Sequence, residues 1–161
     1  MKESRIKNQE SGFTLFVAIV VMGTLLLIAA GIASLAVRQA LISASSRESQ
    51  QAFYAADTGI ECALYWDVQH PLGISAFSTS TGSTIFCNKD SNNPGNQWVV
   101  GGNDTSIINR INFLPDPSCA IVVVTKVYVG GVLKTKIESK GYNTCDLSNP
   151  RRVERAVRAT Y

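Results

Sequence analysis

The sequence has few of the residues on which most enzymes and metal sites depend. Only one of its 161 residues is His and four are Cys, and 17% are charged, below the roughly 25% usual for soluble domains. It contains no CxxC spacing, nucleophile elbow or phosphate-binding loop. We therefore expect no catalytic residue, no metal ligand and no cofactor, and hence not an enzyme. The net charge of +3 is too small to indicate nucleic-acid binding by itself.

Charge is absent from one long stretch, residues 13–37, which is otherwise almost entirely apolar. As a helix rising about 1.5 Å per residue it would reach on the order of 37 Å, enough to cross a hydrocarbon core of roughly 30 Å. A secretory signal is the alternative, but its apolar region usually has only about 7 to 15 residues. Lys2, Arg5 and Lys7 precede the run, so the positive-inside rule places the N-terminus in the cytoplasm. The sequence predicts a single-pass cytoplasmic (inner) membrane protein with the rest of the chain outside.

The helix is expected to continue through residues 38–68, where Pro is absent and good helix formers are frequent. Small and apolar residues recur there at steps of four and three, which predicts an amphipathic segment with one packing face. That face contains Ala52, Ala56, Gly59, Ala63 and Trp66, flanked by Phe53, Ile60 and Leu64. Together the two segments predict one helix of roughly 55 residues.

Residues 69–161 are expected to form an exported, β-rich head. Loop-forming residues dominate residues 69–118, with short strands expected around residues 84–87 and 97–100. Residues 120–129 are rich in strand formers and lead directly into Gly130-Gly131, and residues 132–142 alternate as a return strand, which predicts a hairpin. We prefer a third antiparallel strand over a C-terminal helix for residues 152–161. The predicted class is α+β, a long N-terminal helix packed on a small antiparallel sheet.

All four cysteines, Cys62, Cys87, Cys119 and Cys145, fall on the exported side, where disulfides persist. Four cysteines allow three pairings, and the sequence alone does not select among them. We favour Cys62 with Cys87 and Cys119 with Cys145. Each bond would close a loop of about 26 residues, worth roughly 3.5 kcal/mol by the chain-entropy estimate. Free buried thiols are the alternative.

Two stretches carry a family resemblance. The junction Glu10-Ser11-Gly12-Phe13-Thr14-Leu15, followed by the apolar run, resembles the class III signal of type IV pilins and pseudopilins. The stretch from Gln51 to Glu61 is similar to a helix common in PilX-type minor pilins. The resemblance implies a leader of residues 1–12, cleavage by a prepilin peptidase between Gly12 and Phe13, and N-methylation of Phe13. It also implies the pilin α+β fold.

One position departs from the family pattern. Pilins of the filament body usually carry Glu at the fifth mature position, where it pairs with the terminal amine of a neighbouring subunit, but here that residue is Val17. A carboxylate and an amine in apolar surroundings need each other, so this chain cannot satisfy an incoming amine. In the family, this loss is associated with subunits at the filament tip, as in the K-type pseudopilins.

The resemblance therefore implies a minor pilin or pilus assembly protein. Its partners would be membrane lipid before assembly, the prepilin peptidase, the inner-membrane assembly platform and other pilin subunits on a cell-surface pilus. Its head could serve adhesion, tip initiation or DNA uptake. The alternative is a membrane-anchored extracellular binding module that does not polymerise.

The densest basic cluster lies near the C-terminus and contains Arg151, Arg152, Arg155 and Arg158. We interpret it as a solvated strand face. Binding of DNA or of an anionic surface polymer is the alternative.

Overall fold

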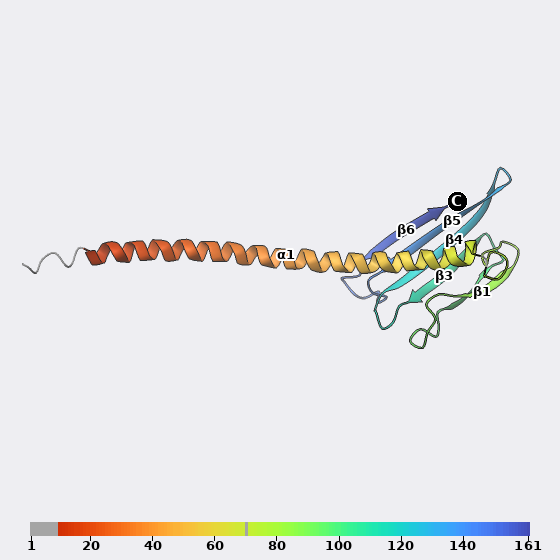
Figure 1. The fold of residues 1–161 in the computed structure, drawn as a ribbon, viewed down its shortest axis with the longest axis horizontal. Helices are drawn as coiled ribbons and strands as arrows, with labels where there is room; N and C mark the ends of the chain where they lie inside the picture. The colour runs from red at the N-terminus through yellow and green to blue at the C-terminus, as the bar shows by residue number, and fades with distance from the viewer. Residues whose placement is uncertain (1–9, 70) are drawn as a thin grey trace, which may run out of the picture. The chain divides into compact units, whose positions relative to one another are not determined.

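The structure, a computed structural model, describes residues 10–69 and 71–161. In these ranges it contains one helix and six strands, and the predicted α+β class is confirmed (Figure 1). The elements are α1 (Glu10–Val68), β1 (Gly82–Phe86), β2 (Gln97–Gly101), β3 (Thr105–Asn112), β4 (Cys119–Val129), β5 (Val132–Tyr142) and β6 (Glu154–Thr160). Most of the predicted leader, residues 1–9, lies outside the described residues.

The strands form two antiparallel sheets. One has four strands in the order β3-β4-β5-β6, and the other pairs β1 with β2. The predicted hairpin is present, with Val129 opposite Val132. Its turn requires glycine, because both Gly130 and Gly131 have positive φ, 61° and 82°. The chain from residue 154 to 160 forms the expected third antiparallel strand, paired with β5.

Strand β3 corrects the expectation that loops dominate residues 69–118. It forms an edge of the four-stranded sheet and buries Ser106, Ile108 and Ile111. Its pairing with β4 shifts register between Ile108 and Ile111, where Arg110 has a φ of 56°. This bulge breaks the two-residue alternation of buried positions, so the usual strand signal is lost.

The chain divides into two compact units, with the boundary between Ser45 and Ser46. The first unit contains the beginning of α1. Each described side chain from Gly12 to Ser45 is exposed there. Among the described residues of this unit, nothing packs against the helix, so its apolar side chains have no partner within the unit.

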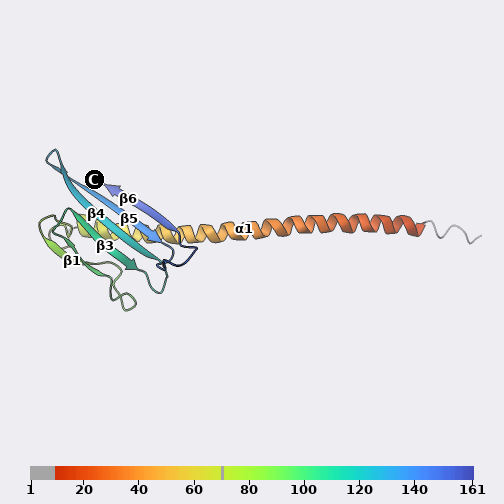
Figure 2. The same cartoon turned by 180° about the vertical axis from the view of Figure 1, so that it is seen from behind.

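In the second unit, α1 covers one face of the four-stranded sheet. It lies in front of the strands in Figure 1 and behind them in Figure 2. Of the predicted packing face, Ala52, Ala56, Gly59, Ala63 and Trp66 are buried. The expectation for Phe53 is wrong, because 47% of it is exposed and Ala55 is buried instead. Phe53 lies about 100° around the helix from Ala52, beyond the narrow stripe that touches the sheet.

Small residues on both sides allow this close approach. A Cβ on Gly59 would lie 2.5 Å from the hydroxyl of Ser139 and 3.0 Å from Val122. A Cβ on Gly141 would overlap the backbone of Ala52 and Ala56. The core then continues from Trp66 to larger residues under the two sheets. Those that are fully buried include Phe77, Ile85, Ile108, Ile111, Val122, Val124 and Ile137.

Candidate functional site

The first candidate site is the surface of α1 before Ser46. Over residues 13–37 apolar side chains cover all sides of the helix, since Leu25, Leu26, Leu27 and Ile28 occupy a complete turn and are each at least 59% exposed. Over the described residues, α1 is the single helix long and apolar enough to cross a membrane. An apolar surface of this extent is stable only when lipid or other protein covers it.

The predicted processing residues lie at the start of this surface. Gly12 has no atom within 4 Å of where its Cβ would be, Phe13 is 71% exposed and Val17 is 42% exposed. Cleavage between Gly12 and Phe13 and methylation of Phe13 stay predictions.

The head contains two disulfides, Cys62–Cys87 and Cys119–Cys145, which are the pairs favoured from the sequence. The first joins α1 to the residue after β1. The second joins the start of β4 to the loop after β5. Each therefore adds a covalent link beside hydrogen bonds that join the same segments, from Trp66 to Phe86 in the first case and from Cys145 to Pro117 in the second.

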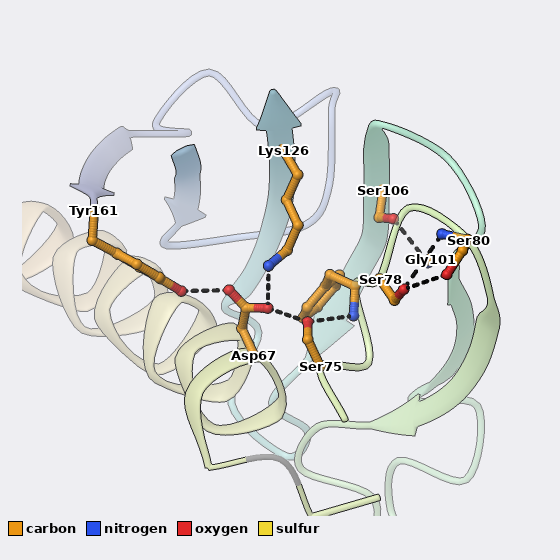
Figure 3. Close-up of polar contacts among 9 residues, drawn as sticks. Asp67, Ser75, Ser78, Ser80, Gly101, Ser106, Lys126 and Tyr161 are labelled. Atoms are coloured by element: carbon orange, nitrogen blue, oxygen red, sulfur yellow. Dashed lines mark hydrogen bonds and ion pairs between the residues drawn. The ribbon is translucent and has the colours of Figure 1, made fainter. Parts of the chain in front are cut away.

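A buried polar cluster at the end of α1 is the main feature that the sequence did not reveal. The carboxylate of Asp67 lies 2.7 Å from the ammonium of Lys126 and accepts hydrogen bonds from Ser75 and from the hydroxyl of Tyr161, the latter at 2.5 Å (Figure 3). Both members of the ion pair are almost fully buried. The sequence did hold a signal for the burial of Asp67, which lies four residues after Ala63 on the packing face, but none for its partners.

The charges in this cluster stabilise one another. Burial raises the pKa of Asp67, but the hydrogen bonds from Lys126, Ser75 and Tyr161 outweigh burial, and the pKa falls below its ordinary value. Burial and the neighbouring carboxylate of Asp67 raise the pKa of the Tyr161 hydroxyl. The cluster joins α1, β4 and the residue after β6 in a fixed arrangement.

A second polar cluster fixes the segment between α1 and β1. The hydroxyls of Ser78 and Ser80 lie 3.0 Å apart, and the hydroxyl of Ser106 accepts a hydrogen bond of 2.9 Å from the amide of Gly101 (Figure 3). Gly101 has a φ of 82°, and a Cβ there would lie 2.5 Å from the carbonyl oxygen of Thr81. These contacts hold the β1–β2 sheet against β3, which is a structural role.

The predicted basic cluster does not form one patch. Arg155 donates to the hydroxyl of Ser49 on α1, whereas Arg158 forms an ion pair of 2.7 Å with Glu138. Arg152 stacks on the ring of Tyr142. The structure therefore separates the side chains that the sequence placed together. The single His of the sequence, His70, lies outside the described residues.

Comparison with known families decides what the N-terminus is. Residues 11–61 match the family model described as PilX N-terminal. The chain carries a type IV pilin-like N-terminus. The match covers the exposed apolar part of α1 and continues to Glu61, on the part that packs against the sheet. Neither the curated proteins nor the solved structures contain a match to the chain.

A PilX-like N-terminus suggests a minor pilin, with a structural rather than catalytic role and with pilus components as partners. The exposed apolar helix is consistent with membrane anchoring of a pilin. The fold, one long N-terminal helix packed against antiparallel strands, is pilin-like.

Proposed function

We propose that this protein is a minor subunit of a type IV pilus or a related filament. The proposal rests on one observation above all: within the PilX-type match, residues 13–37 are apolar on every side of α1, and the residues from Gly12 to Ser45 are all exposed. Such a surface needs lipid or other helices around it. In a filament subunit, lipid surrounds this surface first, while the helix anchors the chain, and other helices surround it later, in the assembled filament.

The proposed organisation has four segments. Residues 1–12 are the leader, and residues 13–37 span the membrane before assembly. Residues 38–68 continue the helix, and residues 69–161 form the exported, disulfide-braced head. A prepilin peptidase removes the leader, and the assembly platform in the inner membrane transfers the processed chain to the other pilins of the growing filament.

Val17 supports a minor rather than a body position. A body subunit needs an acid there to neutralise the amine of its neighbour, and burying an unpaired amine costs several kcal/mol. This subunit can offer its own Phe13 amine to a neighbour that has the acid, but cannot receive one. A position at the filament tip meets that restriction.

The first experiment tests processing in a host that has the peptidase. We expect the mature chain to begin at N-methylated Phe13 and the Gly12→Leu variant to keep its leader. Gly23→Leu is the matched control, because both glycines have no neighbouring atom within 4 Å. Equal processing of Gly12→Leu and the control would contradict the cleavage site.

The second experiment separates the filament role from the alternative, a membrane-anchored binding module that does not polymerise. Surface filaments are sheared from cells expressing the companion pilins and analysed by mass spectrometry. We expect a few copies of this chain per filament. Processed chain that stays entirely in the membrane fraction, with filaments lacking it, would favour the alternative.

A further inference from the structure

The four-stranded sheet has a second face, which α1 does not cover, and that face carries a cleft. The cleft has a volume of about 450 Å³ and crosses the end of β3, the start of β4 and the end of β5. This volume lies in the range of roughly 300 to 1,000 Å³ that small-ligand sites occupy. Its apolar lining includes the Cys119–Cys145 disulfide, Ile121 and Tyr142.

Two arginines on opposite sides of the cleft supply its charge. Arg110 belongs to the bulge of β3, and Arg152 precedes β6. No carboxylate occurs among the described residues that line the cleft. Glu154, on the adjoining strand, forms an ion pair of 3.3 Å with Lys140, and its carboxylate also accepts a hydrogen bond from the hydroxyl of Tyr142 and attracts Arg152. Because Lys140 offsets the charge of Glu154, Arg110 and Arg152 still give the cleft a net positive charge.

Arg152 is held in position. Its guanidinium lies 3.7 Å from the centroid of the Tyr142 ring, and its Nε donates a hydrogen bond of 3.3 Å to the carbonyl of Thr144. Only Nε is engaged in this bond, so the terminal nitrogens keep their hydrogens for another acceptor. A guanidinium fixed in this way loses little entropy when it binds a carboxylate with two parallel hydrogen bonds.

The β3 side of the cleft carries donors without protein partners. Within the described part of the chain, the side chains of Arg110, Asn109 and Asn112 form no hydrogen bond or ion pair, and all three line the cleft. Arg110 also has a φ of 56°, a strained conformation for a residue other than glycine. Such strain is concentrated at ligand sites.

These features favour one ligand class. Two arginines fit one or two carboxylates, the amides of Asn109 and Asn112 fit hydroxyls, and Ile121 with the disulfide offers an apolar floor to the C–H face of a sugar ring. DNA binding depends instead on a long series of phosphate contacts, which two arginines do not supply.

We propose that this cleft binds an acidic oligosaccharide, with Arg110 and Arg152 on its carboxylates. The site lies on the head and is independent of the exposed part of α1. Its failure would therefore leave the proposed filament role intact, and the two are tested separately.

The test measures binding to the full-length protein in nonionic micelles by calorimetry at low salt. The probes are hexagalacturonate, its fully methyl-esterified form, which lacks the charges, and a single-stranded oligonucleotide. We expect hexagalacturonate to bind at least tenfold more tightly than the ester and the oligonucleotide. Arg152→Gln and Arg110→Asn should each weaken hexagalacturonate binding about tenfold.

Two features of the design separate binding from folding. Arg151→Gln is the matched control, because Arg151 is exposed and does not line the cleft. Asn tolerates positive φ, so Arg110→Asn should retain the thermal stability of the head while losing affinity. Absence of hexagalacturonate binding, equal binding of the ester, or equal losses in Arg151→Gln and the cleft variants would overturn the proposal. Tighter binding of the oligonucleotide would overturn it in favour of a nonspecific polyanion surface.

Discussion

The two parts of α1 differ in what their small residues do. Before Ser46, Gly23 and Gly31 have nothing within 4 Å of where a Cβ would be, although the surrounding surface is apolar. After Ser46, Gly59 lies against Ser139, Val122 and Ala120. The first part can accept many neighbours because no side chain is fitted to a particular one. The second part accepts a single partner, the sheet, at a distance that only Gly and Ala permit.

The largest effect is expected when a methyl group is added at the tightest contact between helix and sheet, where Gly141 meets α1. Gly141→Ala should destabilise the head by more than about 4 kcal/mol, because the new Cβ meets backbone atoms of α1 that cannot move aside. Thermal unfolding followed by tryptophan fluorescence, in micelles, measures the loss through Trp66 and Trp98. Gly31→Ala is the control and should change the transition by less than about 0.5 kcal/mol. A similar small change in both variants would remove the distinction between the two parts.

The next largest effect is expected at the ion pair of Asp67 and Lys126, near the end of the part of α1 that packs against the sheet. Lys126→Met should cost about 3 to 5 kcal/mol, because it leaves the carboxylate of Asp67 buried without its cation. Lys134→Met, on the exposed part of the same hairpin, should cost less than about 0.5 kcal/mol. Chemical denaturation of both variants measures the difference.

A double variant sharpens this result. Asp67→Asn combined with Lys126→Met should recover part of the loss, since no unpaired charge remains. A double variant that is less stable than Lys126→Met alone would show that the contacts of Asp67 to Ser75 and Tyr161 matter more than its charge.

A smaller effect is expected where α1 meets β5. Gly59→Ala should cost about 2 kcal/mol through overpacking against the hydroxyl of Ser139. That hydroxyl is buried and has no hydrogen-bond partner among the described residues, so Ser139→Ala alone should stabilise the head by up to about 1 kcal/mol. The double variant should lose less than the sum of the two, which a mutant cycle measures. Strict additivity would contradict direct contact.

The smallest effect is on pH dependence. The pKa of Asp67 is below its ordinary value in the folded head, since the bonds from Lys126, Ser75 and Tyr161 outweigh burial. Its stabilisation is therefore complete above the unfolded pKa of about 3.9 and is lost as the pH falls through the folded value. Acid titration of unfolding should show a steeper loss for the native chain than for Asp67→Asn.

Glu138, whose side chain is 32% exposed, gives the comparison for this titration. Hydrogen bonds from Lys136 and Arg158 also lower its pKa, but its side chain is far more accessible to water than that of Asp67. Added salt should reduce the pH dependence due to Glu138 and leave that due to Asp67 nearly unchanged. Equal sensitivity to salt would show that the Asp67 cluster is open to water.

The sequence predicted the elements that local patterns define. The bounds of β5 could be predicted because the Gly130-Gly131 turn precedes it and its residues alternate between the two faces of a strand. The packing face of α1 could be predicted from its three- and four-residue steps. Phe53 was misplaced because periodicity alone does not give the width of the stripe that the sheet covers.

Features that depend on residues far apart in the chain could not be predicted. Strand β3 has a bulge at Arg110 and polar neighbours, and it becomes a strand only by pairing with β4. The Asp67 cluster joins residues separated by up to 94 positions. The cleft likewise needs the bulge and the chain before β6 to lie on one face of the sheet, an arrangement that only the complete topology specifies.

The positions of the two disulfides have a mechanical consequence. They close stretches with sequence separations of 25 and 26 residues. A fully stretched chain spans about 3.4 Å per residue, so each bond withholds roughly 85 Å of contour from extension. Cys62–Cys87 begins on α1 itself, and a pull along that helix meets a covalent stop before the chain between α1 and β1 can unravel. Under tension, the oxidised head should lengthen far less than its reduced form.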